Sequence, residues 1–105
     1  MKKPRLLTGD TPTGRLHLGH FVGSLENRIV LQDEYECFFI LANMHAFTTR
    51  ANRAQEIRES TLEISLDYLA AGIDPQKSTI FIQSEIPAIA ELTFLFSMLI
   101  PYPRL

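Results

Sequence analysis

The chain has 105 residues, 46% of which are hydrophobic, so we expect one small domain with a substantial apolar core. Its formal net charge of −2 gives no overall attraction to nucleic acid, and its single cysteine excludes an intrachain disulfide. The sequence contains no apolar stretch of membrane-spanning length and no pattern of a secretory signal. We therefore expect a cytoplasmic protein without a membrane partner.

The first half of the chain predicts two strands separated by a helix. Residues Arg5 to Thr8 are expected to form the first strand, and the helix is expected from about Leu18 to Gln32. Apolar residues three and four apart would form its buried stripe, namely Leu18, Phe21, Val22, Leu25 and Ile29. Its water-facing side would carry Glu26, Arg28 and Asp33. The apolar run within Glu36 to Asn43 predicts a second strand covered on both faces, with Cys37 as a buried thiol.

The second half predicts a further helix, strand and helix. Asn52 and Gln55 would form a capping box at the start of the helix, which would end at Gly72 before Pro75. One face would carry Ile57, Thr61, Ile64 and Tyr68, beside Leu62, Leu66 and Leu69. The solvated face would carry Glu56, Glu59, Glu63 and Asp67. Residues Ser78 to Gln83 predict the third strand. The last helix, from Pro87 to about Ile100, is apolar nearly all round and therefore needs a cover of further protein or a second subunit.

This alternation predicts an α/β fold, a parallel-sheet Rossmann-like nucleotide-binding half-domain in the order β-α-β-α-β-α. Such sheets bind their ligands at the carboxyl ends of the strands. The turn after the first strand and the group Asn43, Met44 and His45 after the second would meet at that edge. One ligand site is therefore expected there.

The segment from Thr8 to His20 reads Thr-Gly-Asp-Thr-Pro-Thr-Gly-Arg-Leu-His-Leu-Gly-His and directly follows the first strand. It brings backbone N–H groups, two imidazoles and a helix N-terminus to one point, which suits the phosphates of a nucleotide. It matches neither the Gly-x-Gly-x-x-Gly fingerprint nor the Walker A loop. His17 and His20 lie three residues apart, and Gly19 between them leaves room for close approach.

Other interpretations of these residues are open. His17 and His20 could bind a metal ion together with His45 or Cys37, but Cys37 lies at the far end of its strand, so no metal site is expected. His45 could line a pocket or simply end its strand. Asp10 could hydrogen-bond the turn or weakly repel a phosphate.

The motif resembles the HIGH signature of class I aminoacyl-tRNA synthetases, and the run from Thr8 through Pro12-Thr13-Gly14 is similar to the tryptophanyl form. Two further blocks agree. Asn43 to Thr48 is similar to the Asp-x-His-Ala block of these enzymes, with Asn43 in place of the acid. Tyr68 to Ser84 is similar to their Gly-Ile-Asp-Pro and Phe-x-Gln-Ser blocks. Together the three blocks cover almost the whole chain.

The resemblance implies ATP-dependent activation of L-tryptophan and its transfer to tRNA(Trp), with Mg²⁺ accompanying the nucleotide and no structural metal. His17 and His20 would be catalytic, because they would donate hydrogen bonds to phosphate oxygens as charge builds up. The residues that the resemblance assigns to ATP binding are Thr11, Pro12, Thr13, Gly19 and His20. Those that it assigns to the amino-acid pocket are Leu7, Gly9 and His45.

The resemblance also implies a homodimer, and it places further parts of the catalytic and tRNA-binding machinery after Leu105. We therefore expect residues 1–105 to be the N-terminal part of the catalytic domain, holding half of its ATP and tryptophan site, with weak activity or none by itself. Two alternatives are open: a small-molecule adenylyltransferase of the same nucleotidyltransferase superfamily, or a catalytically inert dimerising module.

Overall fold

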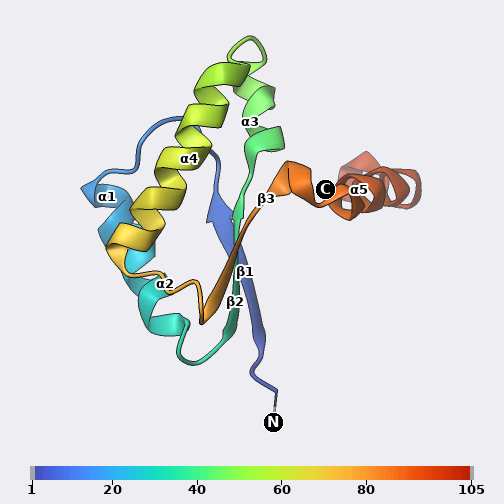
Figure 1. Cartoon of the computed structure of the whole chain (residues 1–105). Coiled ribbons are helices and arrows are strands. Elements are labelled where there is room, and N and C mark those ends of the chain that lie inside the picture. The colour runs from blue at the N-terminus through green and yellow to red at the C-terminus, as the bar shows by residue number, and fades with distance from the viewer. Residues whose placement is uncertain (1, 105) are drawn as a thin grey trace.

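The computed structural model describes residues 2–104, which form a three-stranded parallel sheet and its connecting helices (Figure 1). Strands β1 (Arg5–Asp10), β2 (Glu36–Leu41) and β3 (Ser78–Ile82) are neighbours in chain order. The helices are α1 (Leu18–His20), α2 (Glu26–Leu31), α3 (Asn43–Arg50), α4 (Ala54–Ala71) and α5 (Pro87–Leu99). Shorter turns are the π-helical η1 (Phe21–Leu25) and the 3₁₀ turns η2 (Gln83–Glu85) and η3 (Tyr102–Arg104). The predicted α/β class and parallel sheet are confirmed.

The hydrophobic core lies between one face of the sheet and the helices α2 and α4. Alternate residues of β2, Cys37, Phe39 and Leu41, are buried and pack with Ile64 and Tyr68 of α4. Of the positions predicted on the apolar side of α4, Ile57, Thr61, Ile64 and Tyr68 are buried, as expected. The three leucines predicted beside them, Leu62, Leu66 and Leu69, are instead 46% to 64% exposed. Burial of the Cys37 thiol, also as predicted, raises its pKa.

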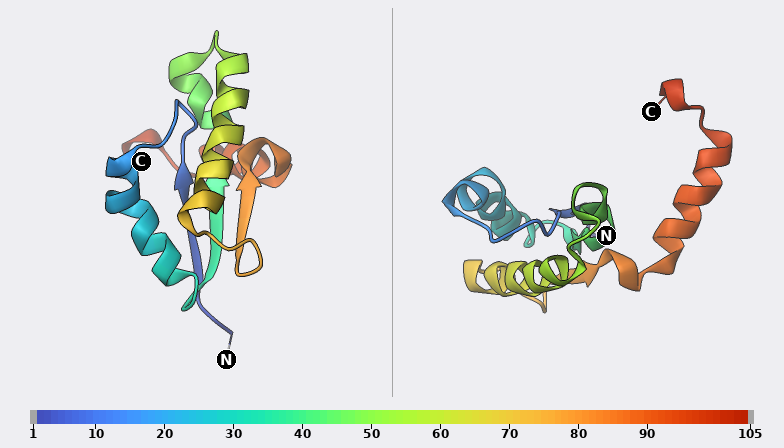
Figure 2. Two further views of the ribbon diagram at one scale, coloured as in Figure 1. Left: turned by 60° about the vertical axis from the view of Figure 1, so that its left-hand side comes forward. Right: turned by 90° about the horizontal axis from the view of Figure 1, so that it is seen from above.

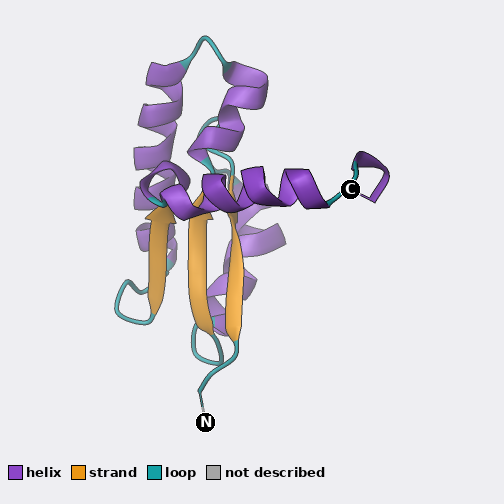
Figure 3. Cartoon of the chain, turned by 90° about the vertical axis from the view of Figure 1, so that its right-hand side faces the viewer, coloured by secondary structure: helices purple, strands orange, loops and turns teal. Residues whose placement is uncertain are grey.

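The opposite face of the sheet is less covered among the described residues. Phe38 and Ile40 of β2 are half-buried, and Leu7 of β1 is 67% exposed. Helix α5 projects away from the sheet and from the other helices instead of packing along this face (Figures 2 and 3). The prediction that the second strand is covered on both faces is therefore wrong for this part of the chain, and the apolar α5 is left without the cover that its composition requires.

The single helix predicted from Leu18 to Gln32 is divided into α1, η1 and α2. In η1 the N–H of Glu26 donates to the carbonyl of Phe21, five residues earlier, so the turn holds one residue more than an α-helical turn. Apolar positions on its two sides then do not line up on one face. Leu25 is buried, but Leu18 and Val22 are 77% and 60% exposed. The predicted stripe is therefore only partly correct.

The second strand ends at Leu41, and the residues expected at its end begin helix α3 instead. The apolar run hides the end of the strand, because Ala42 continues it past Leu41. The capping box predicted at Asn52 is wrong as well. Helix α4 follows α3 after a short turn, so Arg53 occupies the N-cap position and makes no side-chain capping hydrogen bond.

Candidate functional site

The turn predicted to bind phosphate leaves the carboxyl end of β1. Asp10 is the last residue of the strand, and the N–H of Thr13 donates to the carbonyl oxygen of Thr11 at 2.8 Å. Pro12 is buried under the turn, whereas Thr13 is exposed. Gly14 has a φ of +147°, which a residue with a side chain rarely adopts. Pro12 therefore fixes the backbone inside the turn, and Gly14 allows the backbone conformation with which the chain leaves it.

The two histidines cap the helix that follows the turn. The N–H of Gly19 donates to His17 Nδ1 at 3.0 Å, and the N–H of His17 donates to His20 Nδ1 at 3.2 Å. This is a capping box made of imidazoles in place of the usual hydroxyl and carboxylate. The two ring centroids are 4.0 Å apart. The sequence motif alone does not reveal this structural role.

The same hydrogen bonds fix the tautomer of both rings. A neutral imidazole has one N–H and one acceptor nitrogen, and in each ring Nδ1 is the acceptor. In the neutral ring the proton is therefore on Nε2, which the cap does not use. Each ring thus keeps one N–H that can donate to a phosphate oxygen near the start of a helix.

Gly19 is required by the packing of the first histidine. A Cβ atom built at Gly19 would lie 2.8 Å from Cε1 and 3.0 Å from Nδ1 of His17. The imidazole ring therefore lies over the glycine and occupies the space that a side chain would need. This contact explains the glycine between the histidines without any ligand.

A cavity of about 300 Å³ lies against the turn. Its lining residues are Asp10, Thr11, Thr13, Gly14, Arg15, Leu16, His20 and Ile64. Of the residues predicted to bind ATP, Thr11, Thr13 and His20 thus face one cavity. Pro12 is buried in the turn, and His17 and Gly19 are joined to His20 through the helix cap.

A buried ion pair anchors the end of β1 beneath this cavity. Arg28 Nη1 donates to Asp10 Oδ2 at 2.8 Å and to the Tyr68 hydroxyl at 2.8 Å, and that hydroxyl donates to the same carboxylate. Burial acts to lower the pKa of Arg28, but the hydrogen bond to Asp10 and the neighbouring charge outweigh it, and the net shift is upward. Burial and the same carboxylate raise the pKa of Tyr68. Asp10 is therefore neutralised by Arg28 and does not stand unpaired against a phosphate.

The prediction that Arg28 faces water is wrong, because the side chain is only 6% exposed. The sequence contains a signal for this burial. Arg28 follows Leu25 by three residues and so lies on the apolar side of the helix. Its guanidinium also lies 5.8 Å and 5.6 Å from the ring centroids of Phe39 and Tyr68, which stabilise a cation.

An exposed ion pair ties the turn to helix α4. Arg15 donates two hydrogen bonds to the Glu63 carboxylate, one of them from Nη2 to Oε1 at 2.9 Å. The hydrogen bonds and charge of Arg15 lower the pKa of Glu63. Glu63 on the predicted solvated face therefore also fixes the segment that leads to the histidines.

The residues predicted for the amino-acid pocket lie on two different elements. Leu7 and Gly9 lie on the open face of β1, and a Cβ atom at Gly9 would approach the carbonyl oxygen of Ile40 to 1.9 Å. His45 is exposed in the first turn of α3, where its backbone N–H donates to Gln83 Oε1 at 3.1 Å. The ends of β1 and β2 are joined by the N–H of Ala42, which donates to the carbonyl of Asp10 at 2.9 Å.

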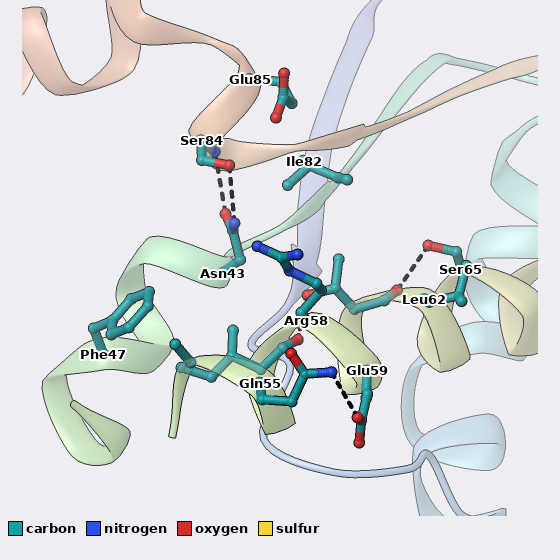
Figure 4. A pocket seen from close by; sticks show the side chains of 13 residues that line it. Asn43, Phe47, Gln55, Arg58, Glu59, Leu62, Ser65, Ile82, Ser84 and Glu85 are labelled. Carbon is teal, nitrogen blue, oxygen red and sulfur yellow. Dashed lines mark hydrogen bonds between the residues drawn. The ribbon is translucent and has the colours of Figure 1, made fainter. Parts of the chain in front are cut away.

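Asn43 stands at the entrance to a larger cavity, of about 720 Å³, between α3, α4 and η2 (Figure 4). Its amide nitrogen donates to the Ser84 hydroxyl at 2.9 Å, and its amide oxygen accepts the Ser84 N–H at 3.1 Å. The lining of this cavity does not include His17, His20 or His45.

Among residues 2–104, no three His, Cys, Asp or Glu side chains are grouped as ligands of a metal ion. Within the same range, no helix combines the length and the apolar composition needed to cross a membrane.

Known proteins resemble this chain in both sequence and structure. The family model of tRNA synthetases class I (W and Y) matches residues 1–105. The chain is 54% identical over 103 residues to a tryptophan–tRNA ligase of Treponema pallidum and 53% identical over 107 residues to one of Lactococcus lactis. These matches cover 96% and 100% of this chain. The chain spans 31% of the length of each of these relatives.

Two solved structures of tryptophanyl-tRNA synthetase from Campylobacter jejuni have the same fold. One superposes with a TM-score of 0.87 at 32% identity, covering 95% of this chain and 31% of that one. The other, solved with ADP and tryptophan, superposes with a TM-score of 0.85 at 33% identity, covering 92% of this chain and 30% of that one. With a helix start that presents two imidazole donors and a family match along its whole length, the chain belongs to the class I tRNA synthetases of the tryptophan and tyrosine group.

Proposed function

We propose that the chain forms the ATP-binding part of a tryptophan–tRNA ligase, which activates L-tryptophan with ATP and transfers it to tRNA(Trp). The observation that carries this proposal is the imidazole capping box, in which Nδ1 of His17 and of His20 accepts a backbone N–H and Nε2 of each ring is not used by the cap. Relatives at 53% and 54% identity are named tryptophan–tRNA ligases, and a C. jejuni neighbour was solved with ADP and tryptophan.

In the proposed reaction, a carboxylate oxygen of tryptophan attacks the α-phosphorus of ATP. A bond forms between them, the bond to the bridging oxygen breaks, and pyrophosphate leaves with that oxygen. The tRNA then displaces AMP from the adenylate. Negative charge on the phosphate oxygens rises in the first step, and donors already held in place stabilise it without reorganisation. His17 and His20 fit this task because their orientation is fixed by backbone N–H groups.

The remaining site residues take supporting roles in the proposal. Thr11, Pro12 and Thr13 shape the phosphate turn, and Gly19 contributes to the ATP site by leaving room for the His17 ring that packs over it. Leu7, Gly9 and His45 would border the amino-acid pocket. Mg²⁺ would arrive with the nucleotide, because phosphate-bound Mg²⁺ needs few protein ligands.

ATP binding with and without the second histidine tests this proposal. We expect His20→Ala to weaken ATP binding by about tenfold, since one charge-assisted hydrogen bond to phosphate is lost. Far-UV circular dichroism of the variant should stay unchanged apart from the helix start. If His20→Ala unfolds the chain, or leaves ATP binding as it was, His20 has only a structural role.

The choice of amino acid needs a separate measurement. Binding of tryptophan, and not of tyrosine, phosphopantetheine or a nicotinamide mononucleotide, would distinguish the proposed ligase from an adenylyltransferase. Because the chain spans 31% of its relatives, we expect weak or no tryptophan-dependent pyrophosphate exchange by the 105-residue chain. Near-native exchange would show that the remaining two thirds are dispensable for activation.

We further propose that the protein works in the cytoplasm as a homodimer. Helix α5 supports the dimer, because nine apolar side chains on and beside it are each at least 40% exposed. They are Ile86, Leu92, Phe94, Leu95, Phe96, Met98, Leu99, Ile100 and Tyr102. A patch of this kind is typical of a surface that another protein covers. Light scattering over a wide concentration range should show a dimer, and a monomer throughout would exclude it.

A further inference from the structure

A second cavity, of about 390 Å³, adjoins the phosphate turn. Its lining consists of Thr13 from the turn, Thr49 and Arg50 from the end of α3, and Arg53 before α4. Thr13 lines this cavity and also the one beside His20. The two cavities therefore share one lining residue, Thr13. The residues predicted to bind ATP or tryptophan do not include Arg50 or Arg53.

The charge at this cavity is positive. Arg50 Nη1 and Arg53 Nη1 both contact Glu56 Oε2, at 3.4 Å and 3.3 Å, so two guanidinium groups share one carboxylate. These contacts are long for charged hydrogen bonds, and the three side chains are 34% to 59% exposed. Exposed pairs of this kind hold their partners weakly. A stronger anion could therefore displace Glu56.

The groups around the cavity match the chemistry of phosphate. Arginine offers a planar fork of N–H donors that fits phosphate oxygens, and the hydroxyls of Thr13 and Thr49 can also donate. The N-cap residue of α4, Arg53, makes no side-chain capping bond, so the positive end of this 18-residue helix adds to the attraction. The arginine pair and the shared cavity lining define the site, and the helix end only strengthens its attraction for an anion.

We propose that Arg50 and Arg53 bind the pyrophosphate portion of the nucleotide, as the β- and γ-phosphates of ATP and as the released pyrophosphate. This inference rests on the proposed function, because it assigns the terminal phosphates of the same substrate. The position beside Thr13 favours it: a triphosphate whose α-phosphate lies at His20 continues along the turn into this cavity. These two arginines bind the leaving group and are not catalytic at the α-phosphate.

Equilibrium dialysis of the 105-residue chain with radiolabelled pyrophosphate, ATP and AMP tests the inference. Arg50→Gln and Arg53→Gln should each weaken binding of pyrophosphate and of ATP by about tenfold, and should leave AMP binding unchanged. Arg53→Lys should retain most of the affinity, since the charge remains. The matched control is Arg58→Gln, which removes an exposed arginine of α4 that lines the cavity of about 720 Å³ beside Asn43.

A variant that removes the competing carboxylate of Glu56 should change the affinity for pyrophosphate in the opposite direction. Glu56→Gln should strengthen pyrophosphate binding by about threefold to tenfold, because both guanidinium groups are then free of their shared partner. A purely structural role of these arginines would give no such gain. Circular dichroism should confirm that each variant is folded, and a gain in affinity cannot come from unfolding.

Three results would overturn the inference: unchanged pyrophosphate binding in both arginine variants, an equal loss in Arg58→Gln, or an equal loss of AMP binding. Binding of a short RNA oligonucleotide that falls in these variants while pyrophosphate binding does not would also overturn it. The proposed function can fail separately. If tryptophan does not bind but pyrophosphate binding still depends on Arg50 and Arg53, the ligase proposal fails and the anion site stands.

Discussion

The ion pair between Asp10 and Arg28 gives the sharpest test of how the site is supported. The guanidinium is 6% exposed and the carboxylate 21% exposed, and the pair is joined at 2.8 Å. The substitution Asp10→Asn keeps the shape of the side chain but removes its charge, so Arg28 is left buried without a counter-ion. Breaking a buried pair from one side costs about 3 to 5 kcal/mol.

We expect the lower end of that range, about 3 kcal/mol, because water reaches part of Asp10 and the new amide can still accept a hydrogen bond. With a urea dependence of about 2 kcal/mol per M, the unfolding midpoint should fall by about 1.5 M. Urea denaturation followed by circular dichroism measures the change. The double variant Asp10→Asn with Arg28→Met should be more stable than Asp10→Asn alone, because no charge is then buried.

Asp33→Asn is the matched control for this experiment. Asp33 also pairs with a cation, Lys77 at 2.7 Å, but the two side chains are 65% and 49% exposed. Loss of this pair should leave the midpoint nearly unchanged, since water already screens it. If Asp10→Asn destabilises the chain no more than Asp33→Asn does, the claim that a buried pair anchors the phosphate turn is wrong.

Three further predictions concern the turn and its supports. Gly19→Ala should weaken ATP binding by about tenfold, because the new methyl group displaces the His17 ring; isothermal titration measures the affinity. The free energy of unfolding should change little, because the lost cap is offset by the higher helix propensity of alanine; urea denaturation measures it. Since the raised pKa of Tyr68 favours its protonated form in the folded state, the free energy of unfolding should fall as the pH rises above the ordinary value of 10.0, and less steeply in Tyr68→Phe. Glu63→Gln should speed trypsin cleavage after Arg15, measured by mass spectrometry, because the turn loses its tie to α4.

The order of strands and helices could be predicted from the sequence because periodicity and capping residues are local signals. The four buried positions of α4 show this, since one helical stripe determines them. Helix α3 could not be predicted in the same way, because Ala42 extends the apolar run of β2 past the end of the strand and the eight-residue helix is too short to show a clear apolar period.

The candidate site was predictable as a motif but not as a geometry. The sequence shows a strand followed by a turn, two histidines and a helix. The side chains that support this turn are far away along the chain. Asp10 meets Arg28 and Tyr68 only because the sheet and α4 bring residues 18 and 58 positions apart into contact. The cavity at Arg50 depends likewise on the unpredicted α3, which ends beside Thr13.

The imidazole cap also links ligand binding to the order of the helix that carries it. When Nε2–H of His17 donates to an anion, electron density on the ring shifts toward Nδ1, which then accepts the Gly19 N–H more strongly. A bound phosphate should therefore slow hydrogen exchange at Gly19 and His17, although it touches neither amide.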